Sequence, residues 1–208
     1  MARTVGIFVF DRIEVLDLGG PFEVFSVANR LALRAGREAP FRVRTVSRDG
    51  GFVTARGGYR FCPSDGFADL PAPEILIVPG GVVERECARP EVIDWLASAH
   101  AQAELTASIC TGAFLLARAG LLDGLRVTTH HEDIDALARQ YPELTVLRGR
   151  AWVDEGGIVT SGGISAGIDM CLHLLARLEG AQTARAVARQ MEYAWRGEDM
   201  TPAPEQPA

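Results

Sequence analysis

The chain has 208 residues, of which 48% are hydrophobic and 23% charged, and its net charge is −6. This composition predicts a single globular domain over residues 1–197 and a proline-rich polar tail over 198–208 that we expect to be disordered. All 21 basic residues are arginines, and they form no basic run or stripe, which argues against a nucleic-acid partner.

Local sequence features argue against a secreted or membrane protein, a nucleotide or metal site and a disulfide framework. The first apolar run, within residues 5–10, is too short for a signal peptide or a membrane span, so we expect a cytoplasmic protein with no membrane partner. No dinucleotide or Walker A motif occurs, and no cluster has the spacing of metal ligands, so we expect neither cofactor nor metal. The four cysteines are widely separated, which favours a reducing compartment over a disulfide framework: Cys62, Cys87, Cys110 and Cys171.

Short β-rich runs alternate with helical patterns along the chain, which indicates an α/β fold with a mostly parallel sheet covered on both faces. Glycine pairs predict a small β excursion at 49–61 and a tight turn at 156–157, inside a hairpin-like stretch at 146–160. In chain order, the pattern predicts strands at 5–10, 41–47, 74–78, 105–109 and 126–129. It predicts helices at 21–35, 90–102, 111–122, 131–141, 164–178 and 183–195.

Cys110 stands where the apolar strand at 105–109 turns into a helix. A thiol at a helix N-terminus lies near unpaired backbone N–H groups, which favour the thiolate and therefore a nucleophile. The alternative is an inert buried cysteine, since free cysteines are among the most buried residues. We predict the nucleophile because other chemical groups follow neighbouring strands.

The carboxyl ends of parallel strands lie at one edge of a sheet, where ligands bind. That edge should bring Asp17, in an apolar segment before the proline-initiated helix, near Cys110; as an alternative, it is an ordinary turn aspartate. Beside a thiolate, its pKa would rise and it could donate a proton. Gly80 and Gly81 follow the strand at 74–78 and could offer backbone N–H groups to an anion.

Two further motifs are ambiguous. His130 ends the strand at 126–129 on the same edge, although a histidine there could equally cap the next helix. Residues 163–167 match the Gly-x-Ser-x-Gly pattern of serine hydrolases, but the acid and histidine that follow Ser165 lie on its own helix. We therefore interpret this segment as close packing of a helix N-terminus near the site.

With these residues identified, the sequence resembles the ThiJ/PfpI superfamily over residues 5–195. The resemblance implies a flavodoxin-like, class I glutamine amidotransferase-like fold, a three-layer αβα sandwich, and a homodimer. Within the superfamily, Asp17, Cys110 and Thr111 match the pattern of the isonitrile hydratases. Gly19 departs from it, because that pattern carries threonine there.

The resemblance implies a cysteine-dependent lyase that adds water to a small isonitrile and releases an N-substituted formamide. Cys110 would attack the isonitrile carbon, Asp17 would supply a proton, and backbone amides around Gly81 and Thr111 would stabilise the covalent thioimidate. The alternative is a ligand- or redox-sensing protein related to the ligand domains of AraC-type regulators. Only about a dozen residues follow Trp195, so we expect no DNA binding of the kind those regulators perform.

Overall fold

The computed structural model describes residues 1–70, 72–195 and 197. The expected disordered tail at 198–208 lies outside the described residues. None of the helices formed by the described residues is long and apolar enough to cross a membrane.

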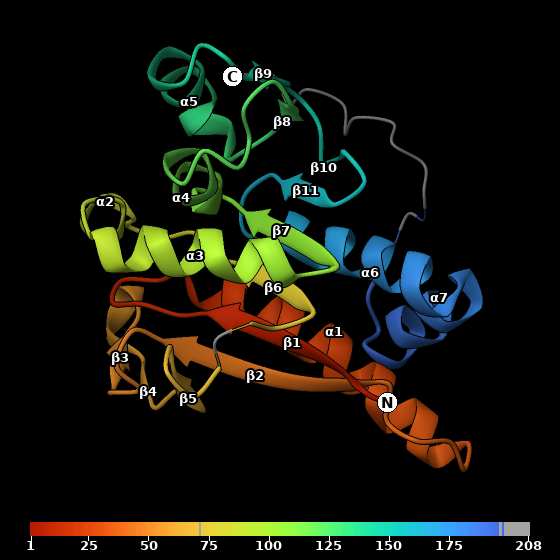
Figure 1. Cartoon of the computed structure of the whole chain (residues 1–208). Coiled ribbons are helices and arrows are strands. Elements are labelled where there is room, and N and C mark those ends of the chain that lie inside the picture. Colours follow the sequence, from red (N-terminus) through yellow and green to blue (C-terminus); the bar gives the residue numbers. More distant parts are fainter. Residues whose placement is uncertain (71, 196, 198–208) are drawn as a thin grey trace.

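A seven-stranded sheet forms the centre of the molecule (Figure 1). Its strands pair in parallel except for β10, which runs antiparallel to β11 at one edge. Three of the inner strands are buried along their whole length because helices cover both faces. In sheet order the strands are β10 (Trp152–Asp154), β11 (Ile158–Ser161), β7 (Leu105–Ile109), β6 (Ile75–Val78), β1 (Arg3–Phe8), β2 (Phe41–Ser47) and β5 (Asp65–Gly66).

The helices form the two outer layers, so the predicted three-layer α/β sandwich is confirmed (Figure 1). One layer contains α1 (Val15–Arg34), α6 (Ala166–Glu179) and α7 (Ala181–Gln190). The other contains α2 (Glu84–Cys87), α3 (Pro90–Gln102) and α4 (Gly112–Arg118). Beyond α4 lie the short helix α5 (Ile134–Gln140) and the 3-10 turn η2 (His131–Asp133).

Helix α1 begins six residues before the predicted start at Pro21, which therefore lies inside the helix. Proline usually marks a first turn because it has no N–H group to donate. Here Pro21 and Gly20 are buried, and a Cβ atom on Gly20 would lie 2.8 Å from Ile168 Cγ1 on α6. This close packing against α6 fits a helix that continues through the proline, and it places Asp17 in the first turn of α1 rather than in a loop.

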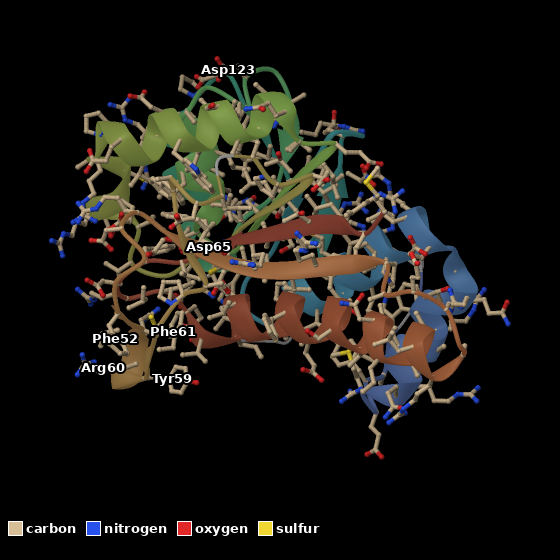
Figure 2. The ribbon with its side chains drawn as sticks, turned by 60° about the horizontal axis from the view of Figure 1, so that its bottom comes forward. Phe52, Tyr59, Arg60, Phe61, Asp65 and Asp123 are labelled. Carbon is tan, nitrogen blue, oxygen red and sulfur yellow. The ribbon has the colours of Figure 1, made fainter. Side chains whose placement is uncertain are left out.

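The predicted β excursion is present as a small hairpin, β3 (Val53–Thr54) with β4 (Arg60–Phe61), joined by the 3-10 turn η1 (Arg56–Gly58). Figure 2 shows its aromatic side chains at the periphery, where Tyr59 stacks on Phe61 and Arg60 lies over Phe52. The hairpin is tied to the start of α1, since Arg56 N–H donates to the Ile13 carbonyl. It therefore supports the segment that carries Asp17.

The strand predicted at 126–129 is shorter and lies outside the central sheet. It forms β8 (Arg126–Val127), which pairs only with β9 (Thr145–Val146) among the described residues. The predicted hairpin further along is present, with Gly156 at φ +87° between β10 and β11.

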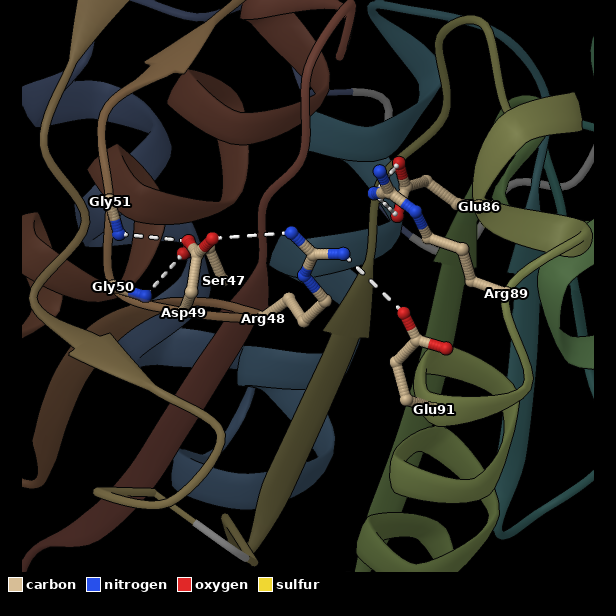
Figure 3. Close-up of polar contacts among 8 residues, drawn as sticks. All are labelled: Ser47, Arg48, Asp49, Gly50, Gly51, Glu86, Arg89 and Glu91. Atoms are coloured by element: carbon tan, nitrogen blue, oxygen red, sulfur yellow. Dashed lines mark hydrogen bonds and ion pairs between the residues drawn. The ribbon is translucent and has the colours of Figure 1, made fainter.

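A polar network fixes the loop after β2 to the start of α3 (Figure 3). The guanidinium of Arg48 binds Asp49 at 3.3 Å and Glu91 at 3.4 Å, while Ser47 and Asp49 accept the N–H groups of Gly50 and Gly51. These contacts join α3 to the β1–β2 side of the sheet at its carboxyl edge.

Candidate active site

Cys110 lies at a strained corner between β7 and α4. Its φ is +54°, a left-handed conformation that costs about 1–3 kcal/mol for a residue with a side chain. Neighbouring segments hold the corner: Cys110 N–H donates to the carbonyls of Ser161 (3.2 Å) and Gly162 (3.1 Å), and its carbonyl accepts the Thr129 hydroxyl at 2.8 Å. The predicted turn geometry is therefore confirmed.

Two glycines let the corner after β6 touch the corner after β7. A Cβ atom on Gly112 would lie 2.1 Å from the Val78 carbonyl oxygen. One on Gly80 would lie 2.6 Å from Thr111 N and 2.9 Å from Cys110 Cβ. All three distances are too short for any side chain, so glycine is required at both positions by close backbone approach.

The amides that the sequence suggested as anion donors are already engaged. Gly80 N–H donates to Asp17 Oδ2 at 2.9 Å, and Gly81 N–H donates to Thr111 Oγ1 at 2.8 Å. The Thr111 hydroxyl in turn donates to the Gly81 carbonyl at 2.9 Å. In this arrangement the Gly81 amide joins the two corners, so its expected role in stabilising an intermediate stays a prediction that requires it to exchange this partner for the substrate.

Asp17 is fully buried in the first turn of α1. Burial raises the pKa of its carboxyl group from 3.8 to about 7; the Gly80 amide opposes this rise and the charge of Glu14 adds to it. Its Oδ1 atom is buried and has no hydrogen-bond partner among the described residues. One carboxyl oxygen is thus held by the backbone, and the other is free to carry a proton.

The Cys110 side chain is also buried, at 7% exposure. Burial, and to a smaller extent the negative charge of Asp17, raise the pKa of its thiol to about 12, although the backbone amides of Thr111 and Ile164 oppose this rise. This pKa favours a resting thiol over the expected thiolate, because desolvation by burial is the largest influence on the sulfur. The predicted electrostatic interaction of Asp17 with Cys110 is present.

A cavity of about 670 Å³ opens over this corner. Cys110, Thr111, Gly81 and His130 line it, whereas Asp17 and Gly80 lie beneath the lining. Helices α2, α4 and α5 form its walls.

His130 reaches the cavity as predicted, but by a different route, because β8 is not a strand of the central sheet. Its ring lies against Gly163, where a Cβ atom would be 2.0 Å from His130 Cδ2. Its Nδ1 atom accepts the Glu132 N–H at 3.3 Å and lies 3.6 Å from Asp133 Oδ2. The helix-capping alternative is thus also present, since His130 caps η2.

Sequence reasoning missed several residues of the cavity wall. Ile164 has φ +50°, and its amide points to the Cys110 sulfur. Phe114 and Arg118 also line the cavity. They follow Thr111 by three and seven positions, a spacing that puts them on the same side of the helix and that could have identified them from the sequence. Ser165 is exposed at the start of α6, consistent with a packing role for its motif, since a Cβ atom on Gly167 would lie 2.9 Å from Ile109.

No group of three or more His, Cys, Asp or Glu side chains that could hold a metal ion occurs in the described part of the chain. The chemistry that this site can perform with its own groups is nucleophilic attack by sulfur, coupled to proton transfer by a buried carboxyl group.

Comparison with known proteins gives relatives of two kinds. The profile of the DJ-1/PfpI family matches residues 3–177. Isonitrile hydratase from Pseudomonas putida is 36% identical over 93% of this chain and 80% of that protein. The transcriptional regulators GbdR and CdhR of Pseudomonas aeruginosa are 31% and 35% identical over 92% and 91% of this chain. The chain spans only about half of each regulator, 51% and 55%.

Solved structures share the fold. A THiJ/PfpI family protein from Pseudomonas syringae has a TM-score of 0.82 at 24% identity, covering 100% of this chain and 78% of that chain. Drosophila melanogaster DJ-1beta has a TM-score of 0.79 at 18% identity, covering 94% of this chain and 100% of that chain. At these identities the likeness establishes the flavodoxin-like architecture alone.

Proposed function

Because this chain belongs to the DJ-1/PfpI family, whose members include both an enzyme and regulators, we propose that it is an isonitrile hydratase-like lyase. One observation carries the proposal. A buried carboxyl group with an unpartnered oxygen interacts electrostatically with a buried thiol that lines a cavity. Addition of a thiol to an isonitrile forms a C–S bond and a C–H bond at the same carbon atom, so it needs both a nucleophile and a proton donor.

The reaction begins with Cys110 Sγ attacking the terminal carbon of the isonitrile R–N≡C. The thiol proton passes through the Asp17 carboxyl group to that carbon, which leaves the neutral thioimidate R–N=CH–S–Cys110. The pKa of Asp17, raised to about 7, suits a group that accepts and returns a proton near neutral pH. The Thr111 and Ile164 amides, which oppose the rise in the pKa of Cys110, stabilise negative charge on the sulfur.

Hydrolysis completes the cycle. Water adds to the thioimidate carbon, the C–S bond breaks, and the sulfur recovers a proton as the formamide R–NH–CHO leaves. Atoms and charges balance without an oxidant, a reductant or a cofactor. The cavity, of about 670 Å³, has room for a small isonitrile and the water.

Turnover of an alkyl isonitrile by the purified protein tests this function. We expect formamide formation, with activity lost in Cys110→Ala and in Asp17→Asn. The matched control is Cys62→Ala, which removes an exposed thiol far along the chain from the site and should keep full activity. Undiminished rates in Cys110→Ala and Asp17→Asn would refute the proposal.

A sensing role is the second candidate, favoured by the likeness to GbdR and CdhR over more than 90% of this chain. Peroxide attacks thiolates, and a thiol whose pKa is raised to about 12 is a poor target for it at neutral pH. What favours catalysis is the buried Asp17 carboxyl group, which can take up the thiol proton during attack on the isonitrile. Mass spectrometry after mild peroxide separates the two: rapid sulfenic or sulfinic acid at Cys110, together with no isonitrile turnover, would favour sensing.

A further inference from the structure

The cavity continues from the reactive corner along one face of α4. Thr111, Phe114 and Arg118 all line it, and their spacing of three and four residues puts them on the same side of the helix. Seven residues separate Thr111 from Arg118, which corresponds to about 10 Å along the helix axis. Cys110, which precedes Thr111, and Arg118 therefore line the cavity about 10 Å apart, and we refer to these two regions as its Cys110 end and its Arg118 end.

The Arg118 end is rich in hydrogen-bond donors. Gln140 lines the cavity there, and its amide donates to the Tyr141 hydroxyl at 3.4 Å. The Tyr141 ring packs edge-on against Phe114, with 6.5 Å between ring centroids. Burial raises the pKa of both Tyr141 and Cys87, and the positive charge of Arg118 partly opposes this rise, so both groups lie within its electrostatic reach.

Arg118 is available to a ligand because it forms no ion pair within the described part of the chain. The other arginine of the cavity, Arg56, is paired with Glu14 at 3.4 Å. The acidic residues Glu132 and Asp133 lie beside His130, at the Cys110 end. Glu84 also lines the cavity, from the start of α2, and competes for the positive charge.

Building on the proposed function, we propose that the substrate is an elongated isonitrile with a carboxylate at its far end, and that Arg118 is the specificity-determining residue that binds this carboxylate. The guanidinium group matches a carboxylate in charge and in planar, two-point geometry. Phe114 contacts the apolar middle of such a chain, while the isonitrile carbon meets Cys110. The length of the cavity then selects the length of the chain.

Kinetics with paired substrates test the inference. We would measure kcat/KM for a series of ω-isocyanoalkanoates and for their uncharged methyl esters. At the preferred length, the acid should exceed the ester about tenfold, mainly through a lower KM, because each 1.4 kcal/mol of binding free energy is a factor of ten. The ratio of kcat/KM for the acid to kcat/KM for the ester should fall toward one in Arg118→Gln and be partly restored in Arg118→Lys.

The matched control is Arg139→Gln, which makes the same charge change on α5, next to Gln140 but outside the cavity lining. It should keep the acid-to-ester ratio of the wild type. Equal kcat/KM for acid and ester in the wild type, an unchanged ratio in Arg118→Gln, or an equal loss in Arg139→Gln would each overturn the inference.

A binding measurement keeps this inference separate from the proposed function. If no isonitrile is turned over, the hydratase proposal fails, but calorimetry with hexanoate and hexanamide still reports on the Arg118 end. Tighter binding of hexanoate that is lost in Arg118→Gln and kept in Arg139→Gln supports the carboxylate site. Equal binding of the two ligands to the wild type refutes it.

Discussion

At the scale of single residues, the site combines two groups that each resist ionisation. Asp17 is fully buried, and the pKa of its carboxyl group is raised to about 7, chiefly by desolvation. Its negative charge then adds to the effect of burial on the pKa of Cys110. The pair therefore holds a proton that an exposed aspartate would release, which is useful for proton transfer and costly for stability.

This cost predicts a pH-dependent stability that depends on Asp17. The folded state holds the Asp17 proton up to about pH 7 and the unfolded chain only up to about pH 4, so the wild type loses stability as pH rises through that window. An asparagine side chain at this position cannot ionise. The free energy of unfolding of Asp17→Asn, relative to wild type, should therefore rise by about 3 kcal/mol between pH 5 and pH 8.

Urea unfolding at the two pH values measures this difference. Asp123→Asn is the control, since Asp123 is an exposed aspartate on the loop after α4 (Figure 2), and it should leave the pH dependence unchanged. If the free energies of unfolding of Asp17→Asn and wild type differ by the same amount at both pH values, the carboxyl group is ionised in the folded protein, and the proton-transfer role fails with it.

At the scale of elements, two strand-to-helix corners are joined back to back. Gly80 follows β6 and contacts the start of α4, while the Thr111 side chain bonds to both the N–H and the carbonyl of Gly81. The sequence identified these corners because each follows a short apolar strand. It could not reveal which backbone groups bond across the corners, since that depends on approach distances between strands.

A methyl group at Gly80 should separate the corners. Gly80→Ala would place Cβ 2.6 Å from Thr111 N, so we expect a loss of about 1–3 kcal/mol in the free energy of unfolding and slower isonitrile turnover. Gly19→Ala is the contrasting variant, because Gly19 lies in α1 with nothing within 4 Å of its Cβ position. It should gain about 0.5–1 kcal/mol. Equal stability of the two variants in urea unfolding would contradict the close approach at Gly80.

Element boundaries were predictable where local signals agreed with packing. The strand at 105–109 and the helix at 90–102, which opens on a proline, match the structure residue for residue. The start of α1 was missed because Pro21 suggested a first turn, whereas packing against α6 accompanies a longer helix. The strand at 126–129 was placed in the wrong sheet, because its sequence does not specify a partner.

At the scale of the whole molecule, the parallel sheet explains why residues 93 positions apart in the sequence interact electrostatically. β1 and β7 flank β6, so the segments that follow their carboxyl ends, carrying Asp17 and Cys110, converge. This convergence was predictable from the alternation of strands and helices. The far wall of the cavity was not, because α2 and α5 are short and their positions depend on loops.

The homodimer implied by the resemblance stays a prediction, and the outer face of α1 indicates where to test it. Val15, Gly19 and Phe22 are spaced four and three residues apart, which puts them on one side of the helix, and Val15 and Phe22 are 36% and 41% exposed. Burial of the exposed Val15 and Phe22 side chains against a second copy would stabilise a dimer, and an alanine at Gly19 would add to this apolar stripe.

Phe22→Glu should therefore shift the sedimentation-equilibrium mass from two chains toward one, because a charge in an apolar interface would be buried without a partner. Phe52→Glu is the matched control, since Phe52 is 69% exposed, lies before β3 rather than on α1, and should not change the mass. A single-chain mass for the wild type would refute the dimer. An unchanged two-chain mass in Phe22→Glu would place the interface elsewhere on the molecule.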